Sequence, residues 1–192
     1  MKKLAIVIGR FQPIHNGHLQ MLAHARTLAS HVMVLAGSVN AEPSFKNPID
    51  FHTRRRLFKA AIQTLDFDPN TFSMNPLDDA NDDDLWAAQV KQHAYTHLFQ
   101  RLSEGDSQDV VLVGHPKDAS SYYLKLFPEW ELSEFQMQRN IDATAIRELM
   151  RNHDNIFDLK AALVPLVPEP TIPHLLDWLI DADGHAMLRC LK

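Results

Sequence analysis

Cysteine is nearly absent from this sequence, because Cys190 is the only one among 192 residues. A single cysteine has no partner for a disulfide within the chain, which excludes the disulfide-rich class of secreted domains. A signal-peptide pattern and long apolar runs are also lacking. We therefore expect a cytoplasmic protein that has no membrane partner.

An excess of positive charge is missing as well. The sequence has 19 lysines and arginines against 24 acidic residues, for a net charge of −5. A protein that binds duplex nucleic acid normally presents a basic face, so we expect no nucleic-acid partner. This charge balance still permits a local basic pocket.

Two familiar kinds of site are absent from the sequence. It has neither a Walker loop nor a G-x-G-x-x-G fingerprint. His15 and His18 form an H-x-x-H pair, but no H-E-x-x-H or paired-cysteine spacing supplies the further ligands of a zinc site. We therefore expect no metal ion held by side chains alone.

The apolar runs indicate the fold. Residues 4–8, 31–36 and 110–113 are apolar nearly throughout and do not alternate with polar residues. Strands have such continuous apolar sequences when helices cover both faces of a parallel sheet. We predict an α/β fold with a doubly wound, mostly parallel sheet, and weaker strands at 71–74 and 131–135. Helices are expected after residue 19 and near 50–65, 82–103, 118–126 and 142–151.

The stretch from Gly9 to Leu19 joins the first strand to the first helix. A helix that begins directly after a strand offers unpaired backbone N–H groups and the positive end of its dipole, which together bind anions. Gly9 and Gly17 allow a ligand to approach the backbone closely. Three side chains that can carry a positive charge or donate hydrogen bonds gather here: Arg10, His15 and His18.

The spelling Gly-Arg-Phe-Gln-Pro-x-His-x-Gly-His resembles the (H/T)xGH element of the nucleotidyltransferase superfamily. It is most similar to nicotinamide mononucleotide (NMN) adenylyltransferases of archaea and of bacterial enzymes fused to a Nudix domain. This resemblance implies a Rossmann-like fold and the reaction of ATP with NMN to give NAD and pyrophosphate, with Mg²⁺ on the ATP phosphates. It implies these catalytic residues: His18, His15, Arg10 and Arg147. The implied ATP-binding set adds Gly9, Phe11, Gly17, Gly114 and Thr144.

Further segments resemble the acceptor-binding parts of the same family. Gly37-Ser38 and Lys46-Asn47-Pro48, followed by Arg54, match one family pattern. Residues 114–128 match a second, which implies that Asp118 faces the nucleotide and that Tyr122 or Tyr123 forms a pocket wall. Trp86 either stacks on the nicotinamide ring or belongs to the core. The implied NMN-binding residues are Ser38, Lys46, Asn47, Arg54, Trp86, Asp118 and Tyr122.

The segment from Ile141 to Arg147 resembles the family element that binds the ATP phosphates at a second helix N-terminus. Thr144 and Arg147 are three residues apart and so share one helical face. Asp142 departs from the family pattern, which has serine there. An aspartate can cap the helix as serine does, but it brings a negative charge toward the triphosphate.

Prolines at 165, 168, 170 and 173 precede an amphipathic pattern over 172–180. We therefore divide the chain into a nucleotidyltransferase domain at 1–164 and a segment at 165–192, whose helix packs on the same domain or on a partner. The sequence leaves open whether the chain forms a homo-oligomer. The Nudix box is absent from the sequence, so no Nudix activity is expected.

Two other functions remain open at this point. The same fold transfers nucleotidyl groups to other phosphate acceptors, such as nicotinic acid mononucleotide, phosphopantetheine or FMN. A protein that keeps the site but has lost turnover would instead be a nucleotide-binding sensor.

Overall fold

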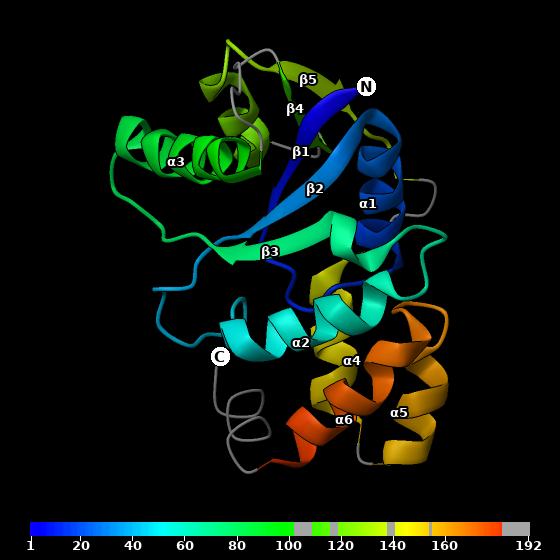
Figure 1. The fold of residues 1–192 in the computed structure, drawn as a ribbon. Helices are drawn as coiled ribbons and strands as arrows, with labels where there is room; N and C mark the ends of the chain where they lie inside the picture. Colours follow the sequence, from blue (N-terminus) through cyan, green and yellow to red (C-terminus); the bar gives the residue numbers. More distant parts are fainter. Residues whose placement is uncertain (102–108, 116–118, 138–140, 154, 182–192) are drawn as a thin grey trace. The chain divides into compact units, whose positions relative to one another are not determined.

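The computed structural model describes residues 1–101, 109–115, 119–137, 141–153 and 155–181. In this part of the chain, five strands form one sheet with the order β3-β2-β1-β4-β5 (Figure 1). Its pairings are all parallel. The strands are β1 (Lys2–Gly9), β2 (Ala29–Ala36), β3 (Phe72–Pro76), β4 (Val110–Gly114) and β5 (Glu131–Glu134). The predicted parallel sheet is confirmed, including its two weaker strands.

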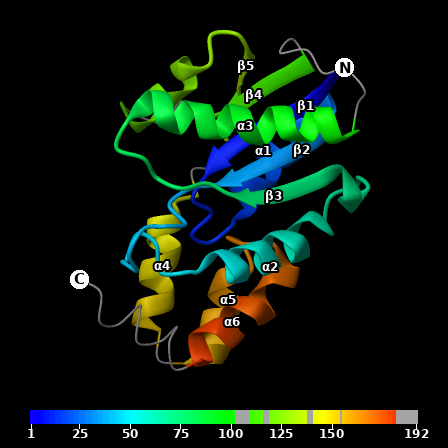
Figure 2. The same ribbon diagram turned by 60° about the vertical axis from the view of Figure 1, so that its left-hand side comes forward.

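Helices cover both faces of this sheet. Figure 2 shows α1 (Asn16–Leu28) behind the sheet and α3 (Asp83–Arg101) in front of it. Leu4 and Ile6 of β1 are fully buried in one cluster with Val90 of α3. Ala5 and Val7 point to the opposite face, because side chains alternate along a strand, and they are fully buried as well. Burial on both faces explains why these strands read as continuous apolar runs.

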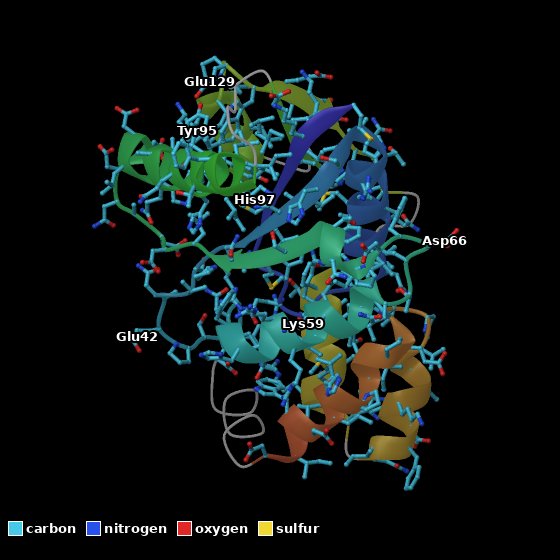
Figure 3. All side chains as sticks on the ribbon, viewed as in Figure 1. Glu42, Lys59, Asp66, Tyr95, His97 and Glu129 are labelled. Atoms are coloured by element: carbon cyan, nitrogen blue, oxygen red, sulfur yellow. The ribbon has the colours of Figure 1, made fainter. Side chains whose placement is uncertain are left out.

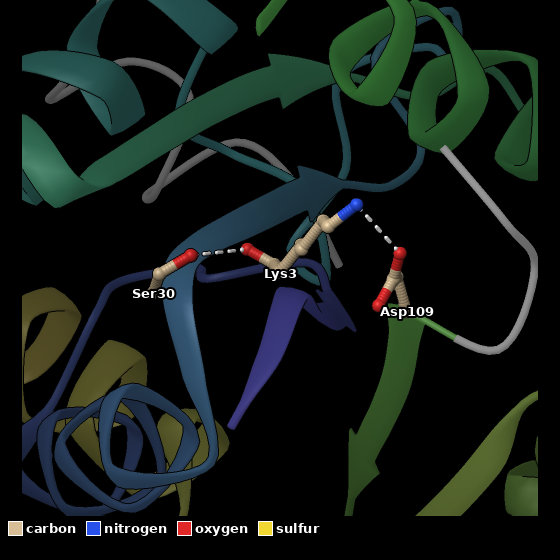
Figure 4. A network of polar contacts seen from close by, with 3 residues as sticks. All are labelled: Lys3, Ser30 and Asp109. Atoms are coloured by element: carbon tan, nitrogen blue, oxygen red, sulfur yellow. Dashed lines mark hydrogen bonds and ion pairs between the residues drawn. The ribbon is translucent and has the colours of Figure 1, made fainter. Parts of the chain in front are cut away.

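Polar contacts of Lys3 join three strand regions at the amino end of the sheet (Figure 4). The carbonyl oxygen of Lys3 accepts a hydrogen bond from Ser30 Oγ at 2.9 Å. Its Nζ lies 2.9 Å from a carboxylate oxygen of Asp109, just before β4. Both partners are partly solvent-exposed, so this ion pair contributes at most about 1 kcal/mol to stability.

The chain forms two compact units whose segments alternate along the sequence. Unit 1 comprises Met1–Gly9, Gln20–Val39 and Asn70–Gln138, and it contains the sheet. Unit 2 comprises Arg10–Leu19, Asn40–Pro69 and Arg139–Lys192.

Unit 2 is built from helices. They are α2 (Phe51–Ile62), α4 (Ala143–Asn152), α5 (Ile156–Leu163) and α6 (Ile172–Ile180), with a short 3₁₀ turn at η4 (Glu169–Thr171). A second 3₁₀ turn, η1 (Pro69–Thr71), lies where the sequence passes from unit 2 to unit 1. Helix α6 packs against α2, α5 and η4. The carboxyl-terminal segment from residue 165 to the end of α6 is therefore part of the same unit as α2.

Two local features differ from the sequence-based expectations. Helix α5 was not predicted, although Asn155 caps it by accepting a hydrogen bond from the backbone N–H of Phe157 at 2.9 Å. The helix expected near 118–126 is a 3₁₀-helix, η3 (Ala119–Leu126).

Over the described residues, no helix combines the length and apolar character that crossing a membrane requires.

Candidate active site

The loop after β1 is held in place from several sides. Phe11 and Ile14 are 2% and 1% exposed, so apolar burial fixes both ends of the turn. The side-chain amide of Gln12 accepts from the backbone N–H of Ile49 at 2.9 Å and donates to its carbonyl oxygen at 2.8 Å. Phe11 adopts a left-handed backbone with φ of 53°, and the Gln12-Pro13 peptide bond is cis. The burial of Phe11 and Ile14 and the hydrogen bonds of Gln12 hold the loop that leads into α1.

His15 and His18 form a reciprocal pair at the start of α1. The backbone N–H of each residue donates to Nδ1 of the other at 3.3 Å. The rings stack with centroids 3.7 Å apart, and the Phe11 ring lies 4.5 Å from that of His18. An Nδ1 atom that accepts a hydrogen bond carries no proton, so each neutral ring keeps its proton on Nε2. The two backbone hydrogen bonds and the ring stacking together fix the orientation of both rings.

Two buried arginines bind the backbone of the same loop. Arg54 of α2 is 2% exposed and donates from Nη1 to the carbonyl oxygen of Arg10 at 2.9 Å. Arg147 of α4 is 4% exposed and donates from Nη1 to the carbonyl oxygen of Gln12 at 2.6 Å. The sequence suggested phosphate contacts for both, and the structure shows that both also hold the loop. Their phosphate contacts stay a prediction.

The guanidinium of Arg147 has donor capacity left over. Its Nη2 donates to Thr144 Oγ1 at 3.0 Å, as expected for residues that share a helical face. Its Nε is buried and has no hydrogen-bond partner among the described residues. Burial first, and then the like charge of Arg10, lower the pKa of Arg147, while Asp142 and Glu148 act in the opposite direction. A bound anion would relieve the repulsion between the two arginines.

Asp142 caps α4 as the sequence predicts. Its carboxylate accepts a hydrogen bond from the backbone N–H of Thr144 at 2.9 Å, and its side chain is exposed. The helix N-terminus in unit 2 thus begins with a negative charge close enough to Arg147 to influence its pKa.

The loop before α2 contributes an aromatic residue that sequence reasoning missed. Phe45 lies against two arginines of α4, with its ring centroid 5.3 Å from Cζ of Arg147 and 4.7 Å from Cζ of Arg151. Its neighbour Lys46 is exposed, and the Oδ1 of Asn47 is buried without a hydrogen-bond partner among the described residues. An aromatic residue directly before Lys46-Asn47-Pro48 was the available signal. Its two arginine partners are about a hundred residues away in the sequence.

The remaining predicted residues near β1 and β2 belong to unit 1. The backbone N–H of Gly37 donates to the carbonyl oxygen of Gly9 at 2.9 Å, which ties the ends of the two strands together. Ser38 has a φ of 56° and donates from Oγ to Asp79 at 3.0 Å. None of the described glycines has a positive φ, so Phe11 and Ser38, not the glycines, take the left-handed backbone after β1 and β2.

Trp86 is half-buried in unit 1. Its ring meets the edge of Tyr123 at 5.7 Å between centroids and lies 6.2 Å from Phe127. It packs on the hydrophobic cluster between α3 and the sheet. One part of the ring thus belongs to the core, while the rest is accessible.

The segment after β4 is partly described. Tyr122 is 53% exposed and donates to Asp83 at 2.7 Å, a hydrogen bond that raises the pKa of its phenol. Burial raises the pKa of Tyr123 to about 12. At Gly114, a Cβ atom would overlap the side chain of Leu124, so a larger residue there would require Leu124 to move. Asp118 lies outside the described residues.

Comparison with known proteins identifies the family of the chain. The profile of the cytidylyltransferase-like family matches residues 6–171. The chain belongs to the cytidylyltransferase-like family. It is 38% identical over 144 residues to the nicotinamide/nicotinic acid mononucleotide adenylyltransferase of Acinetobacter baylyi, which covers 74% of this chain and 72% of that protein. It is 31% identical to the nicotinamide-nucleotide adenylyltransferase of Thermococcus kodakarensis, over 47% of this chain and 48% of the relative.

A solved crystal structure has the same fold as this cytidylyltransferase-like chain. The bifunctional NMN adenylyltransferase/ADP-ribose pyrophosphatase of Francisella tularensis superimposes with a TM-score of 0.79 at 26% identity. The match covers 98% of this chain and 53% of that protein, so the chain spans about half of the Francisella protein. As a member of this family, the chain is a nucleotidyltransferase, and the two relatives named above are pyridine-mononucleotide adenylyltransferases.

Proposed function

We propose that the chain transfers the adenylyl group of ATP to NMN, giving NAD and pyrophosphate. The observation that carries this proposal is the donor set of unit 2, in which the reciprocal histidine pair lies where the loop after β1 enters α1 and the buried Arg147 of α4 donates to the same loop. Donors that are already held in place stabilise charge that develops on phosphate oxygens without further reorganisation. The named adenylyltransferase relatives support the choice of reaction.

This reaction can be catalysed by a site that consists of hydrogen-bond donors and positive charges. A 5′-phosphate oxygen of NMN attacks the α-phosphorus of ATP, the bond between that phosphorus and the bridging oxygen breaks, and pyrophosphate leaves with the electron pair. The attacking phosphate is already anionic at neutral pH, so the step requires no general base. What remains is to align two anions and to stabilise the charge on the α-phosphate and on the departing pyrophosphate.

We assign individual roles within unit 2 on this basis. His18, through Nε2–H, donates to the α-phosphate in the transition state, and His15 and Arg10 bind the phosphates. Arg147 and the backbone at Thr144 bind the β- and γ-phosphates. Lys46 and Asn47 bind the acceptor, and Arg54 acts by fixing the loop carbonyl of Arg10.

In unit 1 we assign Trp86 to the nicotinamide ring and Ser38, Asp118 and Tyr122 to the rest of the acceptor. A flat cationic ring stacks well on indole, an interaction worth roughly 1–2 kcal/mol when water is excluded. The exposed part of Trp86 is available for this contact.

We propose Mg²⁺ as the divalent ion of the reaction. The described residues contain no group of three histidine, cysteine or acidic side chains placed to hold a metal. Oxygen-rich phosphate groups are the preferred ligands of Mg²⁺, which usually keeps several water molecules. The donor set therefore fits a metal that arrives on the ATP phosphates, where it neutralises charge.

One assay tests this function. The purified chain is incubated with ATP, Mg²⁺ and one phosphate acceptor at a time: NMN, nicotinic acid mononucleotide, phosphopantetheine or FMN. Products are then separated by chromatography. We expect NAD from NMN as the fastest reaction. Faster conversion of another acceptor would overturn the substrate assignment, and ATP binding without any product would identify a sensor.

A further inference from the structure

Helix α2 has two chemically different faces. Its buried face carries Arg54, Leu57, Phe58, Ala61 and Ile62, together with Thr53. Its outer face carries Arg55, Arg56 and Lys59, all exposed, with His52 one turn earlier. Residues three, four and seven positions apart fall on one side of a helix, so these four side chains form one row. Lys59 is labelled on α2 in Figure 3.

A groove in unit 2 lies along this row. It has a volume of about 530 Å³ and is lined by His52, Arg55, Arg56, Lys59 and Ala60 of α2 and by His174 of α6. Every polar side chain in this lining is arginine, lysine or histidine. Arginine and lysine can only donate hydrogen bonds, and the lining has no carboxylate, hydroxyl or amide group. A ligand that fits must therefore supply acceptors.

No ion pair within the described part of the chain neutralises the arginines and the lysine of this groove, although the carboxylate of Asp50 acts electrostatically on His52. The ion pairs found there involve Lys2, Lys3 and Lys91 and none of the groove residues. Glu169 of η4 and Asp177 of α6 are exposed on elements that pack against α2, and neither pairs with a groove cation. Arg55 and Lys59 are like charges four residues apart, an arrangement that destabilises a helix. Such a cluster stands out in a chain with a net charge of −5.

We propose that this groove binds an anion with two or more linked phosphoryl groups, at a place distinct from the proposed adenylyl-transfer residues. His52 and Lys59 are seven residues apart, or about 10 Å along the helix axis, so one phosphate cannot reach the whole row. Arginine forks bind phosphate oxygens in a bidentate manner. The row occupies one groove of an acidic chain, which favours a small oligophosphate over a nucleic acid.

The test uses inorganic triphosphate as the probe and the full chain. Imidazole resonances of His52 and His174, assigned with His52→Gln and His174→Gln, are followed by NMR during the titration. We expect both resonances to shift saturably, and the apparent affinity to fall as salt is added. A triphosphate titration that moves only the resonances of His15 and His18 would overturn the proposal.

Matched variants separate this groove from any other anion site. Arg55→Gln combined with Lys59→Gln removes two charges from the groove and should weaken the response of His174 at least tenfold. Lys125→Gln combined with Lys160→Gln removes the same charge from exposed positions elsewhere and should leave that response unchanged. Equal weakening in both pairs would mean that only net charge matters and would overturn the proposal.

Two further measurements complete the test. Arg55→Lys keeps the positive charge, so its affinity for triphosphate should stay within a few-fold of the wild-type value. A variant with a damaged fold would lose this affinity. Binding of a single-stranded oligonucleotide in place of triphosphate would identify a nucleic-acid surface and reject the small-anion proposal. NAD synthesis by the groove variants should equal that of the wild type, so failure of this proposal is distinguishable from failure of the proposed reaction.

Discussion

The backbone N–H of His15 donates to Nδ1 of His18, and the backbone N–H of His18 donates to Nδ1 of His15. Each residue thus fixes the ring orientation of the other. Removing either ring changes both the donor that it supplies and the acceptor that it offers to its partner.

His18→Ala should lower kcat for adenylyl transfer by about 10²–10³, the effect of losing one donor to a transition state. Its KM for ATP should change far less. The N–H of His15 loses its acceptor, at a cost of about 1–3 kcal/mol because that group is partly buried. Steady-state kinetics and thermal melting measure both effects. His153→Ala, at the end of α4, is the control. A folded His18→Ala protein whose kcat falls less than about fivefold would contradict the assigned role.

Phe45→Leu should raise the KM for ATP about fivefold while kcat changes less. The ring contacts the guanidiniums of Arg147 and Arg151, and cation–π contacts are worth roughly 0.5–2 kcal/mol. Phe45→Tyr keeps an aromatic face and should behave as the wild type. Phe157→Leu is the control, since Phe157 is 84% exposed. Equal KM values for the leucine and tyrosine variants would show that Phe45 has no positioning role.

Asp142→Ser should leave the free energy of unfolding unchanged within about 0.5 kcal/mol, because serine and aspartate cap helices almost equally well. Affinity for ATP should rise, up to about tenfold. A carboxylate some 6–8 Å from a phosphate charge repels it by about 2 kcal/mol at an effective dielectric near 20, before Mg²⁺ and salt screen it. Isothermal titration with ATP and Mg²⁺ measures this. Weaker binding would instead indicate that Asp142 orders Arg147 or holds the metal, and Asp142→Asn serves as a second neutral cap.

His93 should make unit 1 sensitive to acid. Burial lowers the pKa of His93, and its hydrogen bond to the carbonyl of Pro76 only partly offsets this. Between the lowered pKa in the folded state and the ordinary value of 6.5, the unfolded state binds more protons, so stability falls as pH decreases through that window. Melting temperatures of the wild type should fall as the pH decreases below 6.5, and those of His93→Gln should fall less. His153→Gln controls for the loss of a histidine, and parallel curves for wild type and His93→Gln would contradict the assignment.

The parts of the structure that could be predicted from sequence depend on local patterns. Residues 4–8 and 31–36 read as buried strands because both faces of the sheet are covered, and they pair in register from Leu4 opposite His31 onward. The cap at Asp142 follows from residue type and position alone. The loop containing His15 and His18 was found because its residues are contiguous.

The parts that could not be predicted depend on contacts between distant residues. The family resemblance implies substrate contacts for Arg54 and Arg147, and the structure shows that each is also buried against a loop carbonyl, 44 residues away for Arg54 and 135 residues away for Arg147. No local pattern signals such a partner. The left-handed backbone at Phe11 and Ser38 was also unexpected, because that conformation normally favours glycine, and here tertiary contacts hold it in place.

The position of β1 in the sheet has a consequence for biosynthesis. On the ribosome, β1 is made before both of its neighbours, and the edge that pairs with β4 must wait for Val110, about 100 residues after Leu4. At about 5–20 residues per second, this interval is roughly 5–20 seconds. During it, an apolar strand keeps one row of backbone groups unpaired, which is the kind of edge that recruits other chains. Nascent chains stalled before residue 110 should therefore depend on chaperones, and chains that have passed β4 should not.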